Sequence, residues 1–75
     1  MNSVYSFSFS RYLEDQKHTR KISASGYKNA IEKACIILEE LDSEVDLIGL
    51  TNWEDVQDEC AEHGLYINDL IELDE

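Results

Sequence analysis

Aromatic and polar side chains alternate along the first stretch of the chain. In VYSFSFSRY (residues 4–12), Tyr5, Phe7 and Phe9 alternate with serines. This period of two predicts a strand with one buried face and one polar face. The polar stretch that follows predicts a hairpin connection. RKISASGY (residues 20–27), with Ile22 and Ala24 on one face, predicts a second strand antiparallel to the first.

Two later stretches carry apolar residues at spacings of three and four, which predicts two helices. In Tyr27–Leu41 this stripe comprises Tyr27, Ala30, Ile31, Ala34, Cys35, Leu38 and Leu41. Ile36 falls on the opposite, polar face of that helix, so we expect it to be exposed. In Trp53–His63 the stripe comprises Trp53, Val56, Cys60 and His63. Thr51 or Asn52 is the expected N-cap of this helix, and Gly64 is its expected stop.

The remaining segments are shorter. VDLIGL (residues 45–50) is mostly apolar and predicts a third strand. LYINDLIEL (residues 65–73) is compatible with a strand or a helical turn, because Asp69 interrupts its alternating face and Asn68 could cap a helix. The pattern therefore predicts a single α+β domain over residues 1–75, with an antiparallel sheet packed on two helices in the order ββαβα(β).

The net charge of −11 is unevenly distributed along the chain. The first 33 residues hold all six Lys and Arg residues and three acids, which sum to about +3. The other 14 acids lie between residues 34 and 75, where no Lys or Arg occurs. This asymmetry predicts a polarised potential and fast association with cationic surfaces. It excludes direct nucleic-acid binding by the acidic part, which would repel phosphates.

The second predicted helix places all its acids on the side opposite its apolar stripe. These acids are Glu54, Asp55, Asp58, Glu59 and Glu62. They form three like-charge neighbour pairs at a spacing of four residues, each of which destabilises a helix by roughly 0.2–0.5 kcal/mol. Because no lysine or arginine offsets them, this face breaks a rule of helix stability, as functional surfaces often do.

More acids gather around the end of the first helix and at the end of the chain. We place Glu39, Glu40, Asp42 and Ile36 in the candidate partner-binding set together with the five acids of the second helix. Ile36, Tyr12 and Tyr66 are its candidate apolar anchors. ELDE closes the chain with three further acids. The alternative is that this charge only keeps a small protein soluble.

Small acidic α+β chains of this kind resemble phage-type inhibitors that mimic DNA, including anti-CRISPR and anti-restriction proteins. The resemblance rests on the acids of the second helix, on EELDSEVD (residues 39–46) and on the final ELDE. It implies a non-enzymatic inhibitor, in the cytoplasm of a host cell, whose acidic surface blocks the basic nucleic-acid-binding site of a CRISPR or restriction protein.

Two alternatives remain open at this point. One is an acidic immunity or antitoxin-like protein that neutralises a basic nuclease, and the other is a structural adaptor subunit whose charge only confers solubility. The chain also has a basic cluster, which comprises Arg11, Lys17, His18, Arg20 and Lys21. We expect it to pair with the acidic half of the same chain or with that of a second copy, which would give a homodimer.

The sequence favours no catalytic or cofactor chemistry. Cys60 and His63 have a metal-compatible spacing, but a structural zinc site needs four ligands. We therefore expect no metal, no cofactor and no enzymatic activity, and we expect Cys35 and Cys60 to be buried reduced thiols. The chain shows neither a signal-peptide pattern nor an apolar run of the roughly 20 residues that a membrane span needs.

Overall fold

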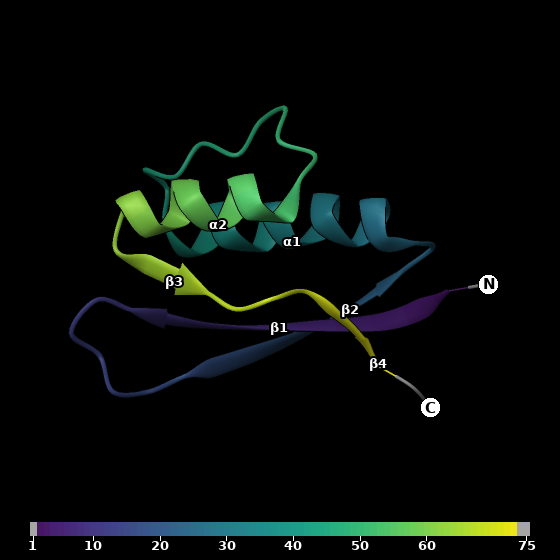
Figure 1. The fold of residues 1–75 in the computed structure, drawn as a ribbon, viewed down its shortest axis with the longest axis horizontal. Coiled ribbons are helices and arrows are strands. Elements are labelled where there is room, and N and C mark those ends of the chain that lie inside the picture. The colour runs from purple at the N-terminus through teal and green to yellow at the C-terminus, as the bar shows by residue number, and fades with distance from the viewer. Residues whose placement is uncertain (1, 74–75) are drawn as a thin grey trace.

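The computed structural model describes residues 2–73, which form a four-stranded sheet and two helices. The chain begins with a hairpin, continues with both helices and ends with two short strands (Figure 1). The elements are β1 (Ser3–Arg11), β2 (His18–Ala24), α1 (Tyr27–Leu41), α2 (Trp53–Glu62), β3 (Leu65–Ile67) and β4 (Ile71–Leu73). The predicted α+β class, with an antiparallel sheet packed on two helices, is confirmed.

β1 is the central strand, and every other strand pairs with it in the antiparallel sense. β2 pairs along one side of β1, while β3 and β4 follow one another along its other side. Phe9 lies opposite Ile67, but Ser6 lies opposite Ile71, so the register shifts by one residue between β3 and β4. This shift is a β-bulge at residues 68–70, with two residues facing one on β1. The ambiguous C-terminal segment is therefore an interrupted strand.

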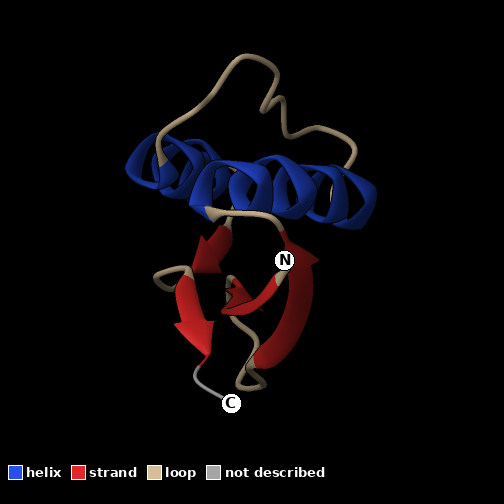
Figure 2. Ribbon diagram, turned by 90° about the vertical axis from the view of Figure 1, so that its right-hand side faces the viewer, coloured by secondary structure: helices blue, strands red, loops and turns tan. Residues whose placement is uncertain are grey.

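Both helices lie on one side of the sheet, and the core fills the space between the two layers (Figure 2). Tyr5, Phe7 and Phe9 point into this core from β1, as the alternating pattern predicted. The stripes of the two helices meet them, with Ala30, Leu38, Val56 and Cys60 completely buried. Of the predicted stripe residues, Tyr27 is instead about half exposed, at 48 %, and His63 is exposed at the end of α2.

Two side chains fix α2 against the bulged edge of the sheet. The Trp53 indole Nε1–H donates a hydrogen bond of 2.8 Å to the Asn68 carbonyl. The Gln57 amide Nε2 donates one of 3.1 Å to the Ile67 carbonyl. The Trp53 ring also packs edge-on against Phe7, with 5.6 Å between ring centroids. The position of α2 over the sheet is therefore set by directional contacts as well as by apolar packing.

The predicted strand over Val45–Leu50 is wrong, because this segment forms turns that connect α1 to α2. The connection crosses the helices on the side away from the sheet, so no strand lies beside it to complete a ladder (Figure 1). Val45 and Leu47 are buried against the helices, which explains the apolar pattern. Their burial therefore produces a strand-like sequence without a strand.

Because of this crossing connection, α1 and α2 run in the same direction and their C-terminal ends lie at the same end of the molecule (Figure 1). The start and the end of α2 follow the sequence prediction. The Asn52 side chain accepts a hydrogen bond of 2.9 Å from the Glu54 N–H as the N-cap of α2. Gly64 ends α2 with a φ of 76°, a left-handed conformation that favours glycine.

Candidate protein-interaction surface on helix α2

The acids of α2 line the side of the helix that faces away from its buried stripe. We call Glu54, Asp55, Asp58, Glu59 and Glu62 the acidic face. Trp53, Val56 and Cys60 are buried beneath it, as their helical spacing predicted. Glu54, Asp55, Asp58 and Glu62 are exposed, and Glu59 is partly exposed. The first two also lie in the first turn, where the helix dipole favours negative charge.

Only one member of the acidic face, Glu59, has a basic side chain within ion-pair distance in the described structure. The Glu59 carboxylate lies 3.1 Å from Nε2 of His63. Across residues 2–73, Glu54, Asp55, Asp58 and Glu62 form no ion pair. Four exposed carboxylates on one helix are therefore available to a partner, while their mutual repulsion is left without compensation.

Two of the candidate acids outside α2 have structural roles. The Glu39 carboxylate accepts a hydrogen bond of 3.2 Å from the Leu47 N–H, and Asp42 accepts one of 3.0 Å from the Glu44 N–H. Asp46 binds the Ile48 N–H in the same way, at 3.2 Å. In a sheet, such backbone N–H groups would donate hydrogen bonds to a neighbouring strand. Here the carboxylates accept these hydrogen bonds instead. Part of the negative charge at this end of the molecule therefore holds the connection in place.

We expect Glu39→Ala to lower the free energy of unfolding by about 1 kcal/mol, because the Leu47 N–H loses its acceptor. Glu39→Gln keeps a carbonyl oxygen at the same place and should cost less than about 0.5 kcal/mol. Urea unfolding of both variants measures the difference. Equal losses in the two variants would show that the charge of Glu39, and not its acceptor atom, holds the connection.

The remaining candidates outside α2 are exposed on α1. Ile36 is 59 % exposed, as predicted, and Glu40, one helical turn further on, is also exposed. Glu40 lies in the last turn of α1, and the C-terminal ends of α1 and α2 lie at the same end of the molecule (Figure 1). Sequence reasoning missed Ile48, which is 85 % exposed, because it placed this residue in a strand. Asp42 and Asp46 could have indicated turns in this segment, because an Asp side chain often starts a turn by binding the N–H two residues later, here that of Glu44 and of Ile48.

The predicted pairing of the basic cluster with the acidic half of the same chain is wrong within residues 2–73, where no Lys or Arg lies at ion-pair distance from a carboxylate. Pairing with the acidic half of a second copy stays a prediction. The Arg11 guanidinium instead donates a hydrogen bond of 2.7 Å to the Leu41 carbonyl at the end of α1. It thereby supplies the positive charge that this helix end lacks. The Arg20 guanidinium lies over the Phe9 ring, 5.2 Å from its centroid.

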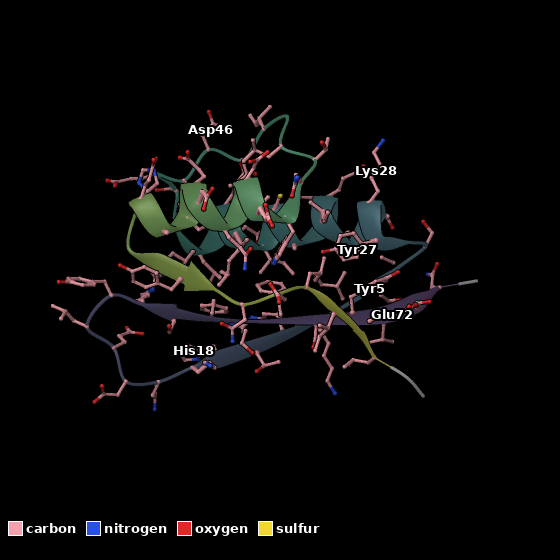
Figure 3. All side chains as sticks on the ribbon, in the orientation of Figure 1. Tyr5, His18, Tyr27, Lys28, Asp46 and Glu72 are labelled. Carbon is pink, nitrogen blue, oxygen red and sulfur yellow. The ribbon has the colours of Figure 1, made fainter. Side chains whose placement is uncertain are left out.

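Where the N-terminal ends of the two helices approach the bulge, the surface has an open groove of about 970 Å³. Its lining carries both signs of charge, with Lys28 from α1, Glu54 from α2 and Asp69 from the bulge. Lys28 points away from the sheet, whereas Tyr27 points toward Tyr5 (Figure 3). The groove borders the acidic face at Glu54.

The two cysteines are reduced and buried. Burial, with smaller contributions from Cys35, Glu59 and Asp42, raises the pKa of the Cys60 thiol to about 12. Burial and the carboxylates of Glu39 and Glu32 also raise the pKa of Cys35. Neither thiol is therefore activated as a nucleophile at neutral pH. Within residues 2–73, no three His, Cys, Asp or Glu side chains cluster in a way that could hold a metal ion.

We expect both thiols to react with iodoacetamide at pH 8 at least about tenfold more slowly in the folded protein than in urea, because burial suppresses the thiolate and limits access. Mass spectrometry of the alkylated protein over time measures both rates. Rapid labelling of Cys60 in the folded protein would contradict its burial beneath the acidic face.

Comparisons with protein-family models, curated proteins and solved structures gave no significant match. In the described part of the chain, no helix is long and apolar enough to span a membrane.

Proposed function

We propose that this protein is a non-enzymatic inhibitor that uses the acidic face of α2 to occupy the basic nucleic-acid-binding surface of a host defence protein of the CRISPR or restriction type. The observation that carries this proposal is the exposure of Glu54, Asp55, Asp58 and Glu62 on one helix without an ion pair within residues 2–73. The resemblance to DNA-mimic inhibitors is compositional and agrees with it.

The spacing of the acidic face suits a surface that binds phosphates. Eight residues separate Glu54 from Glu62, which corresponds to about 12 Å along a helix at about 1.5 Å per residue. Five carboxylates lie within this length. One strand of duplex DNA carries a phosphate about every 3.4 Å, or three to four over the same distance. A row of Lys and Arg side chains that follows a DNA strand would therefore meet a similar density of negative charge.

The acidic face lies on a fixed support. Trp53 and Gln57 bind α2 to the carbonyls of the bulged edge, and the buried stripe of the helix packs on the sheet. A rigid binding surface loses less conformational entropy on association than a flexible acidic tail does. This rigidity favours a specific inhibitor over charge that serves solubility alone.

The charge arrangement is unfavourable for the helix itself. Glu54/Asp58, Asp55/Glu59 and Asp58/Glu62 are like-charge pairs at a spacing of four residues, together destabilising by roughly 0.6–1.5 kcal/mol. Solubility would be served equally well by acids spread over the surface. A binding role explains why five acids share one face of α2 with no lysine or arginine among them.

Affinity capture from lysates of candidate bacterial hosts tests the proposal. We expect the immobilised protein to retain a basic nucleic-acid-binding protein at about 0.1 M salt and to release most of it at about 0.5 M, where surface charges are largely screened. Quantitative mass spectrometry identifies what is retained. Capture of a basic toxic nuclease would favour the immunity-protein alternative. A partner that is not a nucleic-acid-binding protein and stays bound at high salt would favour the adaptor and reject the proposal.

A further inference from the structure

The sheet has one face without helices, which we call the open face. Since both helices lie on the other side, the outward-pointing strand residues form this face (Figure 2). Its centre and one end consist of residues from three neighbouring strands. These are Val4, Ser6 and Ser8 of β1, Lys21 of β2, and Ile71 and Leu73 of β4. Of its two serines, Ser6 is 7 % exposed and Ser8 is partly exposed.

The β-bulge places the apolar residues on this face. Continued alternation after Leu65 and Ile67, which are buried, would have turned Ile71 and Leu73 into the core. The extra residue reverses this orientation, so Leu70 is buried and Ile71 is 53 % exposed. Ile71 and Leu73 then lie beside Ser6 and Val4, their partners on β1. An aliphatic patch is therefore built on the outer side of the sheet.

The open face also differs from the helical side in its charge. Of the strand residues between positions 2 and 73 that point to this side, none is Asp or Glu, and Lys21 carries the only full charge. The acidic face and the acidic connection lie on the helical side of the molecule (Figure 3, where Asp46 marks the connection). In a chain with a net charge of −11, contact between the open faces of two copies therefore brings no strand carboxylate of residues 2–73 into the interface.

Side chains bind the backbone at β2 and in the bulge region, which opposes dimerisation by strand addition at these two places. At β2, the Ser23 carbonyl accepts a hydrogen bond of 2.6 Å from Nζ of Lys33, and the Thr19 carbonyl accepts one of 3.3 Å from Arg20. At the other edge, Trp53 and Gln57 bind the carbonyls of the bulge region. Such contacts block pairing with another strand. Contact between open faces does not need these edges.

We propose that a second copy of the chain binds to the open face, so that two sheets pack face to face and the two acidic faces point outward. The contact buries Val4, Ile71 and Leu73 of both copies in a symmetric interface. It leaves both α2 helices free, so it is independent of the proposed function. The apolar contact is small, so the dimer forms in a concentration-dependent equilibrium with the monomer.

Sedimentation equilibrium over a concentration series measures this equilibrium at about 0.05 M and about 0.5 M salt. We expect dimerisation to strengthen with salt, because salt screens the repulsion between two acidic chains and does not weaken apolar contacts. This trend is opposite to that expected for binding of a basic partner. A chain that remains monomeric at all concentrations and both salt levels would overturn the proposal.

Two pairs of variants locate the contact. Ile71→Asp should weaken dimerisation at least about tenfold, because it would bury an unpaired carboxylate in each copy. Ile48→Asp, with the same change on the exposed connection, should dimerise like the unmodified protein. Ser8→Arg should also give monomers without altering β4, and Ser43→Arg is its control.

Thermal unfolding shows whether each variant is folded. If Ile71→Asp is unfolded, the dimerisation of Ser8→Arg tests the proposal. Dimerisation that persists in the folded open-face variants would overturn the proposal. Partner capture by these variants should be unchanged, so a failure of the dimer and a failure of the inhibitor function give different results.

Discussion

Replacing Asp55, Asp58 and Glu62 with lysine is expected to weaken binding of the captured basic partner by at least about 100-fold. Each replacement turns an attraction into a repulsion, and a total of about 2.7 kcal/mol over three sites corresponds to this factor. Titration of the purified partner in about 0.1 M salt, followed by fluorescence anisotropy, measures the loss.

The same triple variant is expected to fold. Two of the three like-charge pairs on α2 become attractive, which gains roughly 0.4–1.0 kcal/mol each, because a repulsion is replaced by an attraction of similar size. The lysine that replaces Asp55 opposes the helix dipole by a similar amount. We therefore expect the free energy of unfolding to change by less than about 1 kcal/mol, so a loss of binding would not be caused by unfolding.

A matched control separates the acidic face from the total charge. Replacing Glu14, Asp15 and Glu32 with lysine changes the net charge by the same amount, at exposed positions on the hairpin connection and on α1. We expect this variant to bind the partner within about threefold of the unmodified protein, because long-range attraction is screened in about 0.1 M salt. If both triple variants lost binding equally, the net charge and not the face on α2 would be responsible.

The second large effect concerns Trp53, which supports the acidic face from beneath. This side chain is 5 % exposed, packs on Phe7 and donates a hydrogen bond to the Asn68 carbonyl. Trp53→Ala should cost about 3–5 kcal/mol. A core of this size supplies only about 3–5 kcal/mol of stability. We therefore expect this variant to be largely unfolded at 25 °C, as seen by circular dichroism.

Trp53→Phe separates the hydrogen bond from the packing. It keeps an aromatic ring next to Phe7 but leaves the Asn68 carbonyl without its donor, which should cost about 1–3 kcal/mol. A loss of about 1 kcal/mol lowers the melting temperature of a domain this small by roughly 4–8 °C. A folded Trp53→Ala variant with an unchanged melting temperature would contradict the role of Trp53 in fixing α2.

Local chemistry made most of the fold predictable. The alternation of aromatic residues and serines in β1 gave both its extent and its buried face. The spacing of Ala30, Ile31, Ala34, Cys35 and Leu38 gave the buried side of α1. Asn52 and Gly64 marked the ends of α2, because one side chain and one backbone conformation determine these caps.

Features that depend on distant neighbours were not predictable in this way. Val45 and Leu47 are buried against helices, and only the three-dimensional arrangement shows that no strand lies beside them. The bulge between β3 and β4 depends on pairing with β1, and the sequence hinted at it only through the interruption at Asp69. Periodicity describes one element and carries no information about its neighbours.

The candidate surface shows the same division. The helical spacing of the acids on α2 predicted their exposure, which is confirmed for Glu54, Asp55, Asp58 and Glu62. The roles of Glu39 and Asp42 as acceptors for the connection depend on contacts that composition cannot reveal. Asp74 and Glu75, at the end of the acidic tail, lie outside the described residues.

The central claim is that the acidic face and nucleic acid compete for one basic surface. Displacement of labelled duplex DNA from the captured partner, followed by fluorescence anisotropy, tests this claim directly. We expect the unmodified protein to release the DNA as it binds, and the α2 triple variant to release none at the same concentration. A ternary complex, in which the partner holds the protein and the DNA together with unchanged affinity for each, would contradict it.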